Sequence, residues 1–181
     1  MSQNQPAPTG QPIADFSQCH AGIVKKLDML GELPPLLEPA LRAREIAERA
    51  VDFFREAIFE HHLDEERELF PAVLTDAQKG EERDHVQVMV RRLTDEHRVL
   101  EKLWKSLESG LKKVAKGQVS DVSAAEIQRL VTQYRAHAMY EEQEFLPMAQ
   151  RVLGRNSNHM AALGMSLHMR HASPGMISTY I

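Results

Sequence analysis

The 181-residue chain contains a single cysteine, Cys19, so it cannot form an internal disulfide, and this usage fits a reducing compartment. No run of about 18 apolar residues is present, which argues against a membrane-spanning helix. The first residues, MSQNQPAPTGQP, lack the basic and apolar stretches of a secretory signal. A net charge of −4 provides no basic surface for nucleic acid or anionic membrane. We therefore expect a cytoplasmic protein with neither a nucleic-acid nor a membrane partner.

The sequence also lacks the alternation of apolar and polar residues that marks β-strands. Apolar residues recur at steps of three and four throughout, which predicts an all-α chain. Glycine and proline separate the helical stretches, which we place at residues 13–30, 39–71, 82–116, 123–152 and, for a shorter fifth helix, 158–171. Short connections favour antiparallel neighbours, so the predicted fold is an antiparallel up-down four-helix bundle.

The domain organisation follows from these stretches. Residues 1–12 are rich in proline and glutamine and are expected to be a flexible tail. Residues 13–153 are predicted to form the bundle, and residues 154–181 a short C-terminal helix and tail. That tail carries several methionines and histidines, which favour a helix that covers the bundle end or contacts a second copy in a homodimer.

Each of the four long helices has one histidine where its apolar stripe predicts a leucine. These residues are His20, His61, His97 and His137. His97 follows His20 by 77 residues and His137 follows His61 by 76, which indicates a two-fold repeat of a helix pair. The stretches EHHLDEERELFP (60–71) and RAHAMYEEQEFLP (135–147) repeat the same chemistry, and in each a glutamate follows the histidine by one turn: Glu65 and Glu141.

A pair of cations explains this pattern better than an apolar core does. Burying two carboxylates beside four imidazoles costs several kcal/mol unless these groups are paired, with cations or with one another. Imidazole and carboxylate together suit iron, manganese or zinc, and the two glutamates could each bridge two metals. The protein groups would fill only part of the coordination shells, which leaves positions open for a small ligand. A ferritin-like site is disfavoured because its paired Glu-x-x-His motifs are missing.

With His20, HHLDE (61–65), His97 and HAMYE (137–141) in this order, the chain resembles the hemerythrin-like HHE cation-binding family. The resemblance covers about residues 13–150. It implies an antiparallel four-helix bundle with a non-haem di-iron centre, for which zinc or manganese could substitute. The ligands that it implies are His20, His61, Glu65, His97, His137 and Glu141. The small ligand would be dioxygen, nitric oxide or peroxide.

Some features depart from the oxygen-carrying members or stay open. Where those carriers have a fifth histidine, this chain has Glu101, and their spacing for the last carboxylate points to Glu142 instead of Glu141. His62 and Glu66 lie off the apolar stripe, which is more typical of a solvated face than of residues that orient ligands. Turnover at the metal, a sensor or iron-handling role, and a structural bundle with a single metal all remain alternatives.

Overall fold

The computed structural model describes residues 12–54 and 58–156, with side chains from residue 20 onward. The chain divides into two units, residues 1–45 and 46–181, and each is described by itself. The described residues contain helices and no strand, so the prediction of an all-α chain is confirmed. No helix among them is apolar over a long enough stretch to cross a membrane. The predicted fifth helix, at residues 158–171, lies outside the described residues.

The first unit contains helix α1 (Pro12–Gly31) and the beginning of helix α2 (Pro34–Phe53). Helix α2 begins five residues earlier than predicted, so Pro39 lies inside the helix instead of at its start. Proline is tolerated in a first turn because the missing N–H has no partner there, and Pro34 and Pro35 use this freedom.

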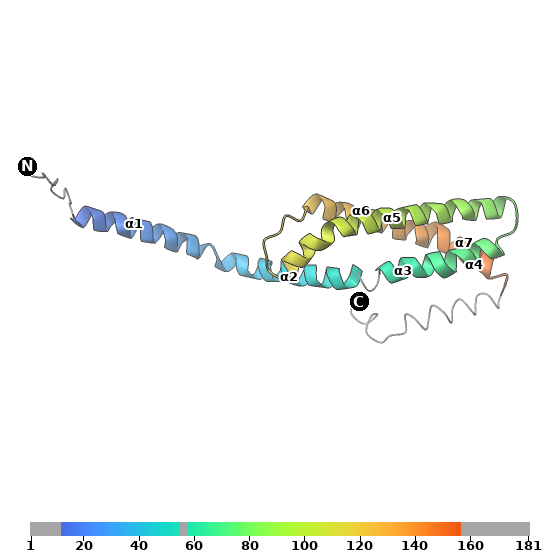
Figure 1. The fold of residues 1–181 in the computed structure, drawn as a ribbon, viewed down its shortest axis with the longest axis horizontal. Helices are drawn as coiled ribbons and strands as arrows, with labels where there is room; N and C mark the ends of the chain where they lie inside the picture. Colours follow the sequence, from blue (N-terminus) through green and yellow to red (C-terminus); the bar gives the residue numbers. More distant parts are fainter. Residues whose placement is uncertain (1–11, 55–57, 157–181) are drawn as a thin grey trace, which may run out of the picture. The chain divides into compact units, whose positions relative to one another are not determined.

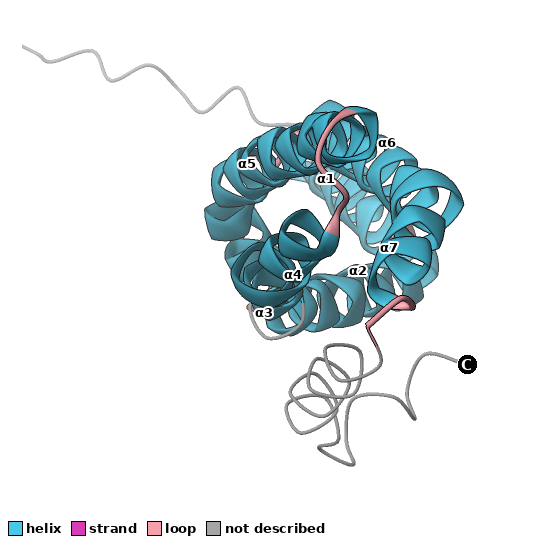
Figure 2. Cartoon of the chain, turned by 90° about the vertical axis from the view of Figure 1, so that its right-hand side faces the viewer, coloured by secondary structure: helices cyan, strands magenta, loops and turns pink. Residues whose placement is uncertain are grey.

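The second unit is built from three helical segments that follow the end of α2 (Figure 1). The first and the third of these segments each contain one π-helical turn. The first segment comprises α3 (Phe59–Asp64), the π turn η2 (Glu65–Leu69) and α4 (Phe70–Asp76). The second is α5 (Glu81–Ala115), and the third comprises α6 (Ala124–Tyr140), the π turn η3 (Glu141–Phe145) and α7 (Leu146–Leu153). The view in Figure 2 shows α4, α5 and α7 grouped around a common axis.

Local sequence signals set the ends of α5 and the start of α6. Gly80 has a φ of 101° before α5, and three acidic residues in the first turn of α5 complement the helix dipole. At the other end, Gly117 has a φ of 67° and the amides of Gly117 and Gln118 donate to the carbonyls of Val114 and Lys113. Ser123 Oγ then accepts from the Glu126 amide at 3.2 Å, which caps α6.

The two π turns fall at the same place in the repeated sequence, and in each case one residue separates the turn from a proline. The Phe70 amide donates to the Glu65 carbonyl and the Leu146 amide to the Glu141 carbonyl, five residues back in each case. Proline lacks an N–H and its ring crowds the carbonyl four residues earlier, so a widened turn keeps the helix continuous. The prediction that the helix ends at Pro71 is therefore wrong, because the chain continues through it as α4.

The apolar core of the second unit forms two clusters, and both involve α5. One cluster joins α4, α5 and α7 through Phe70, Val73, Ala77, Val86, Met89, Leu93, Phe145, Ala149, Val152 and Leu153. The other joins the end of α2 with α5 and α6 through Val51, Leu100, Leu103, Trp104, Leu107 and Leu130. Between Leu93 and Leu100, α5 carries buried His97. The chain order of these contacts shows that α5 runs antiparallel to α6 and α7.

Gly110 provides a test of the contact between α5 and the loop before α6. A Cβ atom at this position would lie 2.9 Å from Val122 Cβ and 3.2 Å from Ser120 Oγ, and Ser120 Oγ donates to the Gly110 carbonyl at 2.9 Å. Alanine normally stabilises a helix relative to glycine by roughly 0.5–1 kcal/mol. Here we expect Gly110→Ala to destabilise the protein by about 1–2 kcal/mol because of the clash. Urea unfolding measures this, with Ser109→Ala on the exposed face as the control. A Gly110→Ala protein more stable than the wild type would contradict the prediction.

Candidate metal centre

A layer of buried polar side chains separates the two apolar clusters. It contains three histidines and two glutamates whose residues are 0 to 7% exposed: His62, His97, His137, Glu65 and Glu141. One ligand atom each from Glu65, His97, His137 and Glu141 lies within 4.8 Å of all the others, and the same holds for the three histidines. The structure therefore brings together four of the six predicted ligands, from η2, α5, α6 and η3.

Within this layer, imidazole nitrogens face carboxylate oxygens. His97 Nε2 lies 3.3 Å from Glu65 Oε2, and His137 Nε2 lies 3.4 Å from Glu141 Oε1. None of these four atoms has a hydrogen-bond partner. In the described part of the chain, seven buried side-chain nitrogen or oxygen atoms lack a partner, and six of them belong to this layer. Buried acceptors without partners cost free energy, so the layer requires a positive charge or protons between its atoms.

The other ring nitrogen of each of two histidines is held from the neighbouring helix. His97 Nδ1 is 2.8 Å from Glu66 Oε1, and His137 Nδ1 is 3.0 Å from Glu96 Oε2. Burial opposes ionisation of Glu66, but the hydrogen bonds from His97 and Arg98 outweigh it and lower the pKa of Glu66. In the same way, burial opposes ionisation of Glu96, but hydrogen bonds from Arg92 and His137 lower its pKa.

The other two predicted ligands, His61 and His20, are not in this group of atoms. The side chain of His61 is 46% exposed, although its Nε2 lies 3.4 Å from Glu65 Oε1. His20 lies on α1 in the first unit, so its ligation stays a prediction. The Cys19 side chain lies outside the described residues.

The expectation that His62 and Glu66 face solvent is wrong. His62 is 1% exposed and stacks on His97, with ring centroids 3.9 Å apart. Ile58 is buried, and a step of three from it reaches His61 while a step of four reaches His62, so periodicity alone allows either histidine to point inward. Glu66 is partly buried because it reaches across to His97 on α5.

The structure also separates the glutamates that the sequence left open. Glu141 is buried and points into the layer, whereas its neighbour Glu142 is exposed. Glu101 is partly buried, pairs with Arg98 at 2.9 Å and lies 4.0 Å from His62 Nδ1. Sequence reasoning missed Glu96, whose signal is its position directly before His97, where the helical turn directs it to the next helix.

In the absence of a metal ion, burial disfavours the charged forms of the side chains in the layer. Desolvation raises the pKa of Glu65 to about 7, and desolvation together with the nearby Glu65 charge raises the pKa of Glu141 to about 8. Desolvation, with the adjacent His97 and His137 rings, lowers the pKa of His62 to about 2. Desolvation also raises the pKa of Tyr134, whose ring centroid is 5.9 Å from that of His137, to about 12.

The donor set fits a transition-metal cation. Imidazole nitrogen and carboxylate oxygen suit iron, manganese or zinc and disfavour calcium and magnesium. Metal–ligand bonds of about 2.1 Å at right angles place two donor atoms about 3 Å apart, close to the 3.3 and 3.4 Å between the facing atoms. If a metal binds, Glu65, His97, His137, Glu141 and His62 are the described residues best placed to hold it.

These features define a helical protein with a buried histidine–carboxylate site suited to a cation. The chain matches the Hemerythrin HHE cation binding domain over residues 11–149, and it belongs to that family. A protein of Haemophilus influenzae named "Uncharacterized protein" is 26% identical over 148 residues, which is 80% of this chain and 83% of that protein. No solved structure matches the chain significantly. The expected family and the hemerythrin-like helical fold class are thus confirmed.

The raised pKa values of Glu65 and Glu141 predict how the metal-free protein responds to pH. The folded state keeps protons that the unfolded chain, with a pKa of 4.5, has already released, so this stability is lost as pH rises through 7 to 8. His62 acts in the opposite direction, but only below its unfolded pKa of 6.5. We expect the free energy of unfolding to fall by on the order of 2 kcal/mol between about pH 6.5 and 8.

Urea unfolding in the presence of a chelator measures this change. The Glu65→Gln/Glu141→Gln double variant serves as the matched control, because its amides do not titrate and its stability should be nearly constant over the same range. A wild-type protein that gains stability between pH 6.5 and 8 would rule out the assigned protonation of the two carboxyl groups.

Proposed function

We propose that the chain holds a non-haem di-iron centre that binds or reacts with dioxygen, nitric oxide or peroxide. The observation that carries the proposal is the pair of facing acceptors, His97 Nε2 with Glu65 Oε2 and His137 Nε2 with Glu141 Oε1, in a buried layer. Two facing pairs favour two cations over one, and Glu65 and Glu141 would hold these cations together with the histidines of the layer. Membership of a cation-binding family supports the same choice.

The nitrogen donor from the α3 segment has two candidates. His62 is favoured by its burial, because both of its ring nitrogens lack hydrogen bonds and one lies within 4.8 Å of nitrogens of His97 and His137. His61 is favoured by its helical spacing and its 3.4 Å contact with Glu65. We propose His62 as the donor in the described arrangement, and ligation by His20 stays a prediction from the sequence.

The protein's own groups would hold the iron and shield it from bulk water. Iron bound in the layer would supply redox chemistry toward the small ligand. The flanking apolar clusters exclude water, and Phe70 and Trp104 lie among their fully buried side chains. A groove of about 250 Å³ between α5 and α6 is lined by His137 together with Glu96, Val99, Leu100, Gln133 and Ala136, and it offers a small molecule a route to the layer.

Metal analysis and visible spectroscopy of protein purified without oxygen test the proposal. We expect about two iron ions per chain, as the paired donor set requires, and absorption bands that change when dioxygen, nitric oxide or peroxide is added. Steady consumption of one of these ligands would indicate turnover, and a single stoichiometric change would indicate binding or sensing. One zinc per chain with no colour would refute the di-iron centre and favour a structural site.

Two pairs of neighbouring residues test which side chains hold the metal. Glu141→Gln should lower iron content at least severalfold and lower the melting temperature of the loaded protein, because a charged donor is lost. Glu142→Gln should leave both unchanged, since its side chain is exposed. Likewise His62→Ala should lose more iron than His61→Ala. Full iron in Glu141→Gln, or a larger loss in His61→Ala than in His62→Ala, would overturn the corresponding assignment.

A further inference from the structure

Two histidines of the layer are each connected to an arginine through a carboxylate. Glu66 accepts from His97 Nδ1 with Oε1, at 2.8 Å, and its Oε2 pairs with the Arg98 guanidinium. Glu96 accepts from His137 Nδ1 with Oε2, at 3.0 Å, and its Oε1 accepts from Arg92 Nε at 2.8 Å. The same three-residue arrangement therefore occurs twice, once between η2 and α5 and once between α5 and α6.

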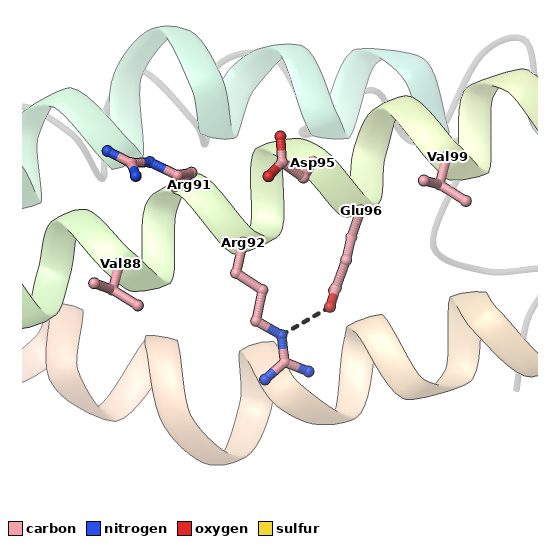
Figure 3. Close-up of a pocket in the computed structure, with 6 residues that line it drawn as sticks. All are labelled: Val88, Arg91, Arg92, Asp95, Glu96 and Val99. Atoms are coloured by element: carbon pink, nitrogen blue, oxygen red, sulfur yellow. Dashed lines mark hydrogen bonds and ion pairs between the residues drawn. The ribbon is translucent and has the colours of Figure 1, made fainter.

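The arginines hold the carboxylates so that each presents one oxygen to a histidine. Arg92 and Glu96 project from α5 on the same side, toward the neighbouring helix drawn in orange (Figure 3). The Arg92 guanidinium also lies 3.6 Å from the centre of the Tyr140 ring, which fixes its orientation. Arg98 is held in turn by Glu101 at 2.9 Å. Each carboxylate thus has both oxygens engaged, one by an arginine guanidinium and one by a histidine imidazole.

An ionised carboxylate can only accept hydrogen bonds, so Nδ1 of each ring carries a proton. In the neutral ring, Nε2 of His97 and of His137 then carries a lone pair that points into the layer, where neither atom has a hydrogen-bond partner. We propose that Glu66 and Glu96, held by Arg98 and Arg92, are positioning residues that fix the Nδ1–H form of His97 and His137 and so present both Nε2 atoms to a cation. This inference rests on the proposed function for its cation, but the ring tautomer is defined without one.

Replacing glutamate by glutamine tests this in a way that simple loss of packing does not imitate. Glutamine has the same shape but only one acceptor oxygen. If the arginine takes that oxygen, the amide NH₂ faces Nδ1 and donates to it, which moves the ring proton to Nε2 and blocks the metal-facing atom. Removing the arginine as well frees the amide to turn its oxygen back toward Nδ1.

The experiment combines nitrogen NMR of ¹⁵N-histidine-labelled, metal-free protein with iron competition against a chelator. In the wild type we expect His97 and His137 to carry their protons on Nδ1. Glu66→Gln should move the His97 proton to Nε2 and weaken iron binding by about 10–100-fold. Adding Arg98→Met to that variant should restore both the Nδ1–H form and most of the affinity. At His137, Glu96→Gln alone should likewise move the proton to Nε2 and weaken iron binding, and adding Arg92→Met should reverse both effects.

Glu108→Gln is the matched control, because Glu108 forms an ion pair with Lys112 on the same helix and contacts no histidine. It should change neither the tautomers nor the affinity. A wild-type His97 or His137 protonated on Nε2 would overturn the inference, as would a Glu66→Gln protein that behaves like the control or is weakened further by Arg98→Met. A wild type with Nδ1–H rings that binds no iron would refute only the di-iron proposal.

Discussion

The structure depends on acceptor atoms that face one another in a dry layer. His97 Nε2 and His137 Nε2 approach carboxylate oxygens of Glu65 and Glu141 at 3.3 and 3.4 Å without hydrogen bonds. Such a contact repels unless a positive charge lies between the atoms, and the low polarity of the surroundings strengthens both the repulsion and the attraction to a cation. A proton on the carboxyl group also relieves this contact, and burial favours that form because desolvation raises the pKa of both carboxyl groups.

The fold supports this layer by placing an apolar cluster on each side of it. α5 contributes to both clusters, so His97 is fixed between Leu93 and Leu100 in one continuous 35-residue helix. The other two segments each make a π turn that begins at a glutamate of the buried layer and ends shortly before a proline. A π turn shifts the register of the residues after it. The glutamate can therefore face the layer while Phe70 and Phe145 still reach the apolar cluster beyond it.

The sequence predicts those parts of the molecule in which one periodicity holds without interruption. Along α5, the buried residues Val86, Leu93, His97, Trp104 and Leu107 are separated by steps of three, four or their sum, because an unbroken helix keeps its phase over its whole length. Where prolines or alternative steps intervene, the phase becomes ambiguous. Steps of three and of four from Ile58 both satisfy a helical stripe, and the step of three put His61 in the predicted stripe although His62 is the buried residue. Pro71 resembled a helix end, although the π turn carries the helix through it.

The residues that support the ligands are harder to predict than the ligands, for a physical reason. His97 and His137 can be predicted as buried residues from the apolar stripe of the helix that carries each of them. Glu66 and Glu96 lie at the edges of their stripes, where most glutamates are solvated, and only the approach of the next helix gives each a histidine to hold. Their role depends on how closely neighbouring helices pack, and the periodicity of a single helix does not predict this distance. His97 and His137 are nonetheless each supported by a glutamate from the preceding helical segment. The sequence repeat does not relate these two glutamates, because it aligns Glu66 with the exposed Glu142, so the support of the layer comes from helix packing and not from the repeat.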